Sequence, residues 1–275
     1  QEASTTLVGH LTRCVAAACG APTGTPGPVQ INVAFRDPLT PASPSAFGDE
    51  AGASFAPRPT RVLPASPVST RWEDVVGPAA AGLIIAGDGA SPFAREWSRA
   101  SGFPLLAEPA SGAWADGGVT PFEQSLVASS LGREVDTVVV TGRPTLSRPI
   151  HALLARPDVR VILVDPHAPW VDVSGNASVV VADLEPARGP VDAVQAEWAS
   201  RVREAARDAG ERIDSLLAAG SGRTTLDLAR AVAASTSGPL VLGASNPVRA
   251  FDLAVPTLEG RVVHSNRGQA GIDGT

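Results

Sequence analysis

Short apolar runs alternate with amphipathic segments along most of the chain. Seven runs read as strands: 80–87, FPLLAEP, 136–142, 160–166, 178–183, 238–245 and GRVVHSN. Segments with apolar residues at helical spacing lie between or beside them: SPFAREWSRASG, RPIHALLAR, PVDAVQAEWASRVREAARDAGERIDSLLA (one or two helices) and TTLDLARAVAAST. Because strands that are apolar throughout must be covered on both faces, this alternation predicts an α/β fold with a parallel sheet.

The beginning of the chain has a different pattern. An alanine-rich stretch from Thr5 to Cys19 predicts a helix, and the alternating segment from Pro28 to Phe35 predicts a strand. Residues 37–70 are then dense in Pro, Ser, Ala and Gly, a composition that neither sustains a helix nor buries much surface. We expect a linker and a domain boundary there.

Composition narrows the functional classes. The chain of 275 residues is 44% hydrophobic and 18% charged, with a net charge of −6 that argues against a nucleic-acid partner. No stretch has the roughly 20 apolar residues that span a membrane, and no secretory signal is visible. Cys14 and Cys19 lack redox or metal spacing and fit a cytoplasmic protein with packing thiols. The absence of Met suggests a processed or excised piece.

Two loops after expected strands carry candidate chemistry. AGDGASPFA lies where a dinucleotide-binding fold has its first glycine loop, but it lacks the third glycine, so a tight strand-to-helix turn is the favoured interpretation. TGRPTLSRP places Arg143 and Arg148 after another strand and before a helix, which suits an anion or carboxylate site, although solvated loop arginines are the common alternative. The four histidines have no metal-ligand spacing and are interpreted as structural.

The segment GASNPVRAFD gathers polar residues at the end of an apolar strand. It holds Ser245, Asn246 and Arg249, and Pro247 predicts an irregular turn. Arg267 follows the next expected strand, and neighbouring parallel strands lie about 4.8 Å apart. Two arginines and a serine could therefore converge on one acidic ligand, since guanidinium forks suit carboxylates. A hinge between domains with incidental arginines is the alternative.

Five motifs occur in an order that resembles one enzyme family. GPVQINVAFRDPL, GRPTLSRP, DVSGN, LGASNPVR and SNRGQAGIDGT resemble the SEPHCHC synthase (MenD-type) family of menaquinone biosynthesis, and the composition looks actinobacterial. The resemblance implies a three-domain thiamine-diphosphate transferase that also uses Mg²⁺ or Mn²⁺, with a Rossmann-like central domain. It assigns residues 1–40 to the tail of the pyrimidine-binding domain, 41–75 to a linker, 76–240 to the central domain and 241–275 to the start of the pyrophosphate-binding domain.

The resemblance also implies a reaction and roles for residues. The family joins 2-oxoglutarate to isochorismate with loss of CO₂. Ser245, Arg249, Arg267 and Arg148 match substrate-binding positions, and Gly271 and Ile272 match positions beside the cofactor. Arg143 is a candidate for a regulatory anion site, because some members bind a downstream naphthoate in the central domain; Pro169, lying where a second basic residue would help, weighs against it.

Other family features are expected to lie outside the chain. The glutamate that activates the cofactor would precede Gln1 and the metal motif would follow Thr275, so these residues alone are expected to hold no catalytic residue and to be inactive. The intact enzyme is expected to be a homodimer or homotetramer, without FAD or NAD. Two alternatives stay open: a stand-alone Rossmann-like nucleotide-binding or regulatory module, and a thiamine enzyme of the acetolactate synthase type.

Overall fold

A computed structural model describes residues 2–21, 25–32, 34, 37, 68–167, 170–220 and 222–266. The chain divides into two compact units, one of Gln1–Pro67 with Pro166–Pro169 and one of Val68–Asp165 with Trp170–Thr275. The predicted domain boundaries near 40, 75 and 240 stay predictions.

In the first unit, helix α1 (Glu2–Ala18) confirms the predicted helix over Thr5–Cys19. The predicted strand from Pro28 to Phe35 is wrong for its described part, because residues 28–32 and 34 are exposed and have no regular secondary structure. Within the described residues no strand pairs with them, and alternation alone cannot form a strand whose backbone groups lack a neighbouring strand.

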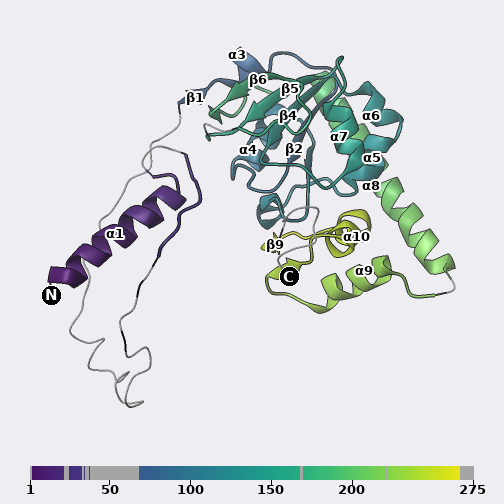
Figure 1. The fold of residues 1–275 in the computed structure, drawn as a ribbon. Helices are drawn as coiled ribbons and strands as arrows, with labels where there is room; N and C mark the ends of the chain where they lie inside the picture. The colour runs from purple at the N-terminus through teal and green to yellow at the C-terminus, as the bar shows by residue number, and fades with distance from the viewer. Residues whose placement is uncertain are drawn as a thin grey trace. The chain divides into compact units, whose positions relative to one another are not determined.

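The second unit is built on a parallel sheet of five strands, shown in Figure 1. The strand order is β3-β2-β4-β5-β6, and the strands are β2 (Gly82–Ala86), β3 (Leu105–Ala107), β4 (Thr137–Thr141), β5 (Arg160–Val164) and β6 (Ala177–Val181). All four strand pairs are parallel. The predicted α/β class and the strands assigned to these segments are confirmed.

Successive side chains of each central strand enter two different cores. In β2, Ile84 belongs to one apolar cluster and Leu83 to the other, and both are almost fully buried. The first cluster includes Trp97 of helix α4 (Ala94–Ser101), and the second includes Trp198 of helix α8 (Ala193–Ala219). A buried Val, Leu or Ile contributes roughly 1.5–3 kcal/mol relative to exposure, so the apolar strand runs require cover on both faces.

The sequence predicted some of the remaining helices of the unit and missed others. Helix α7 (Arg148–Leu154) and helix α9 (Thr225–Ser235) confirm predicted helices, and α8 shows that the long segment is one helix of 27 residues. Helix α10 (Asn246–Ala254) corrects the irregular turn expected at Pro247. Pro247 lies in the first turn of α10, where its missing N–H costs no helical hydrogen bond.

Short elements complete the unit. They are β1 (Ser69–Thr70), α3 (Trp72–Val75), the 3-10 helix η2 (Ala113–Asp116), α5 (Glu123–Ala128), α6 (Ser130–Glu134), β7 (Asp183–Leu184), β8 (Leu240–Leu242) and β9 (Val263–Ser265). β1 pairs with β7, and β8 pairs with β9, both in parallel. None of the helices among the described residues is both long enough and apolar enough to cross a membrane.

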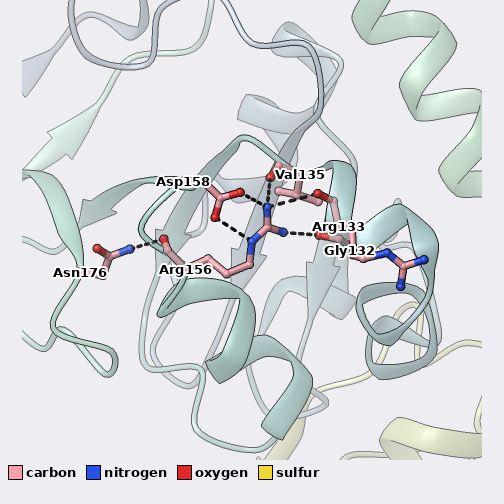
Figure 2. Close-up of polar contacts among 6 residues, drawn as sticks. All are labelled: Gly132, Arg133, Val135, Arg156, Asp158 and Asn176. Atoms are coloured by element: carbon pink, nitrogen blue, oxygen red, sulfur yellow. Dashed lines mark hydrogen bonds and ion pairs between the residues drawn. The ribbon is translucent and has the colours of Figure 1, made fainter.

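One arginine joins the segments that lead into three strands. Figure 2 shows the Arg156 guanidinium between the backbone carbonyls of Gly132, Arg133 and Val135, to which it donates at 2.7, 3.2 and 3.4 Å. The same group pairs with Asp158 at 2.6 Å. The Asn176 amide donates to the carbonyl of residue 156 at 2.8 Å, which brings in the segment before β6. These contacts hold the amino-terminal ends of β4, β5 and β6 in register.

We predict that Arg156→Ala lowers the free energy of unfolding by about 2 kcal/mol, because three backbone carbonyls lose a charged donor. Urea denaturation of the variant and the parent chain would measure this. Arg133→Ala is the matched control, because the Arg133 side chain is exposed and has no partner in the described residues. Equal losses in the two variants would show that the Arg156 contacts do not stabilise the sheet.

Candidate functional site

The loops that follow β2 and β4 pack directly against each other at the carboxyl edge of the sheet. A Cβ on Gly87 would lie 2.1 Å from the Pro144 nitrogen, so only glycine permits this approach. The backbone N–H of Arg143 donates to the Asp88 carbonyl at 2.9 Å, and the N–H of Ser91 donates to Thr141 Oγ1 at 2.8 Å. The glycine-dependent turn predicted for AGDGASPFA is confirmed.

These loop contacts lie at the topological switch point of the sheet. From β2 the chain proceeds to β3 on one side, and then to β4 on the other side. In open α/β sheets a nucleotide binds in the crevice that such a switch creates. Here an isolated β-bridge between Asp88 and Arg143 joins the backbones of the two loops at the position where that crevice would open.

Leu146, in the loop between β4 and α7, connects three segments through its backbone. Its N–H donates to Glu108 Oε1 at 2.5 Å, at the carboxyl end of β3. Its carbonyl accepts from Arg249 Nη1 of α10 at 2.7 Å. The structure therefore brings Arg249 to the segment after β4 that contains Arg143 and leads to Arg148, the first residue of α7.

The predicted substrate residues lie around this connection. Arg148 is the first residue of α7, two positions beyond Leu146, and is exposed. Ser245 precedes α10, and its exposed side chain makes no capping hydrogen bond. Ser245 lies outside the helix, with a φ of −156° and a ψ of −115°, and Arg249 is in the first turns of α10, four positions later.

Three predicted residues, Arg267, Gly271 and Ile272, lie outside the described residues. The strand before Arg267 is β9, and its parallel pairing with β8 confirms that the two strands expected at this edge are neighbours. Arg143 is described, and its guanidinium forms an exposed ion pair with Asp88 at 3.4 Å.

Carboxyl groups lie buried behind Arg249. Glu123 of α5 is 2% exposed, and among the described residues neither of its carboxyl oxygens has a hydrogen-bond partner. Asp252 of α10 is 7% exposed and accepts a hydrogen bond from the Gln124 side chain. Removing a carboxylate from water without enough partners is costly, so burial favours the protonated form.

The pKa values of these groups follow from burial and charge. Burial raises the pKa of Glu123 well above its usual value, and the charges of Asp252 and Glu108 raise it further. Burial also raises the pKa of Asp252, to about 6, against the opposing effects of the Gln124 hydrogen bond and the Arg249 charge. Arg249 is therefore linked both to the loop at Leu146 and to the ionisation of Asp252.

Sequence reasoning missed these buried acids, although a signal exists for one of them. Val248, Phe251, Asp252 and Val255 have the spacing of an apolar helix face, so an acid at position 252 is expected to be buried. Glu123 lies in a short helix that the sequence did not predict. Within the described residues, no group of His, Cys, Asp and Glu side chains could hold a metal ion.

Three curated proteins that are similar to the chain all have the same enzyme name. No protein-family model matches the chain. A 2-succinyl-5-enolpyruvyl-6-hydroxy-3-cyclohexene-1-carboxylate (SEPHCHC) synthase of Kineococcus radiotolerans is 41% identical over 278 residues, which cover 96% of this chain and 48% of that protein. Enzymes of the same name from a Nocardioides species and from Mycobacterium avium are 37% and 36% identical over 91% and 96% of the chain.

The chain thus spans about half the length of the curated relatives it matches. These relatives confirm the resemblance that the five sequence motifs suggested, and they confirm its actinobacterial character.

We predict that stability decreases as the pH rises from 5 to 7. Folded Asp252 and Glu123 hold protons that the unfolded chain releases, so a rising pH lowers the free energy of unfolding through this window. Asp252 alone should account for about 1 kcal/mol, and Asp252→Asn should remove that amount. Denaturant titrations at several pH values would measure both slopes.

Asp214→Asn is the control for this measurement, because the Asp214 side chain is 65% exposed. It should keep the slope of the parent chain. An unchanged slope in Asp252→Asn would contradict the proposed protonation.

Proposed function

We propose that the chain forms part of a SEPHCHC synthase, a transferase of menaquinone biosynthesis that decarboxylates 2-oxoglutarate and adds the resulting four-carbon unit to isochorismate. The observation that carries this proposal is 33–41% identity to enzymes of that name over at least 90% of the chain. The basic carboxyl edge around Leu146 is consistent with it, since both proposed substrates are dicarboxylates.

In this proposal Arg249 binds a substrate carboxylate. The Leu146 carbonyl holds its Nη1 at 2.7 Å and so fixes the plane of the guanidinium. The side chain is exposed, so its remaining N–H groups can donate to a carboxylate in the paired geometry that guanidinium favours. The exposed Ser245 hydroxyl, just before α10, is proposed to donate to the same group.

Arg148 and Arg267 are proposed as further carboxylate partners. Arg148 is exposed at the start of α7 and has no partner within the described residues, so its donors are free for a ligand. Arg267 would act from the segment after β9, the neighbour of the strand that leads to Ser245. Arg143 stays a proposed regulatory anion site, where an incoming carboxylate would compete with Asp88.

Thiamine diphosphate with Mg²⁺ or Mn²⁺ is the proposed cofactor. When bound, it would supply the nucleophile for the 2-oxo carbon and accept the negative charge left by CO₂. Gly271 and Ile272 would lie beside it, but both are outside the described residues. Among the described residues, the chain's own contribution is to position carboxylates.

The proposal extends to the assembly. Residues 1–40 would belong to the pyrimidine-binding domain, 41–75 to a linker, 76–240 to the central domain and 241–275 to the pyrophosphate-binding domain. The enzyme would be a homodimer or homotetramer in the cytoplasm. A stand-alone nucleotide-binding module has less support, because the bridge between Asp88 and Arg143 crosses the expected crevice. An acetolactate synthase type would need fewer carboxylate partners than this edge offers.

The test uses the complete gene product, supplied with thiamine diphosphate, Mg²⁺, 2-oxoglutarate and isochorismate. We expect CO₂ release that depends on both substrates. Arg249→Ala should lower kcat/KM by about 10- to 100-fold, the loss typical of one charged hydrogen bond.

Since Arg249 also contacts Leu146, Arg148→Ala serves as a second variant that breaks no described contact, and Arg133→Ala as a control that should keep the parent rate. A rate of CO₂ release that is the same with and without isochorismate would overturn the synthase assignment. Full activity in both Arg249→Ala and Arg148→Ala would overturn the carboxylate site alone.

A further inference from the structure

A second basic depression lies between helices α4 and α8, at the amino end of β3. Arg95 and Arg99 of α4 and Arg203 of α8 line it, together with Phe103 and Pro104 of the segment leading into β3. Its volume is about 490 Å³, which is within the range of small-molecule sites. The Leu146 site lies at the carboxyl ends of the strands, so the two sites are at opposite edges of the sheet.

The three arginines of this depression lack counter-ions. No Asp or Glu side chain is among the residues that line it. Within the described part of the chain, none of Arg95, Arg99 and Arg203 forms a hydrogen bond or an ion pair. Other described arginines, such as Arg156 and Arg201, pair with carboxylates.

A neighbouring depression does contain acidic side chains, so their absence is specific to the depression lined by Arg95, Arg99 and Arg203. It shares Arg203, Gly118 and Thr120 with the first one and continues along α8. Its arginines have acidic partners: Arg207 pairs with the nearby Glu204 at 3.7 Å, and Arg230 pairs with Asp214, which also lines it. Positive charge is thus compensated on one side of Arg203 and uncompensated on the other, in a chain whose net charge is −6.

The shape and lining of the depression indicate a class of ligand. Guanidinium groups bind phosphate and carboxylate through paired hydrogen bonds, and three of them suit a ligand with more than one anionic group. The walls at Phe103, Pro104 and Val191 are apolar and suit an organic body. Gly118, which also lines the depression, has a φ of +76°, a backbone conformation that favours glycine.

We propose that the depression lined by Arg95, Arg99 and Arg203 binds a small organic anion that carries two or more phosphate or carboxylate groups. This inference does not depend on the proposed synthase activity, because none of the residues proposed for that activity lines the depression.

The test is isothermal titration of the complete gene product with two probes, inorganic pyrophosphate and phthalate. We expect saturable binding of at least one probe in the millimolar range or tighter. Arg95→Gln and Arg203→Gln should each weaken it roughly tenfold or more, since each removes a charged hydrogen-bond donor. Tighter binding of pyrophosphate would indicate a phosphate ligand, and tighter binding of phthalate a carboxylate ligand.

Arg212→Gln is the matched control, because Arg212 is exposed on the same helix, in a depression that also contains Asp208 and Glu211. It should leave the affinity unchanged, and circular dichroism would verify that all variants are folded. Absence of binding by both probes would overturn the proposal. Equal weakening in Arg203→Gln and Arg212→Gln would overturn it as well, because that result means diffuse electrostatic attraction.

Discussion

The parallel pairing of all five central strands is the constraint on which the second unit depends. Parallel neighbours need crossover connections, so helices must cover both faces of the sheet, and the strands must be apolar on both sides. The same pairing sends the carboxyl end of every strand to one edge. At that edge Glu108 and Leu146 supply polar groups, and Arg249 reaches Leu146 from α10, which follows β8 of the separate β8–β9 pair. Arg156 joins the segments at the opposite edge.

At the carboxyl edge, the backbone of one residue, Leu146, connects the segments of the candidate site. Leu146 uses its N–H for Glu108 and its carbonyl for Arg249, so an apolar residue becomes the point where three segments meet. Arg249 in turn acts on Asp252, whose carboxyl is buried beside Glu123. The orientation of a proposed substrate-binding arginine is therefore tied to the packing and protonation of the helices behind it.

Sequence patterns predicted the parts of the structure that depend on periodicity. The Val, Ile and Leu runs predicted the central strands, and Ser245, Arg249 and Arg267 were expected to converge because they follow two strands predicted to be parallel neighbours. Periodicity did not predict the features that depend on contacts between residues far apart in the sequence. Nothing local shows that residues 28–32 have no partner strand among the described residues, that the carbonyl of Leu146 accepts from Arg249, or that the approach of Pro144 requires glycine at position 87.

The Leu146 junction also has a consequence for how the chain folds. Its two hydrogen bonds close loops that span 38 and 103 residues. Closing the longer loop costs only roughly 0.9 kcal/mol more conformational entropy than closing the shorter one, because the cost grows with the logarithm of length. Joining distant segments at this site therefore adds little to the entropy cost of folding. Its main effect is on the folding rate. High contact order slows folding, so we expect the carboxyl edge to be assembled late, after local helices have formed.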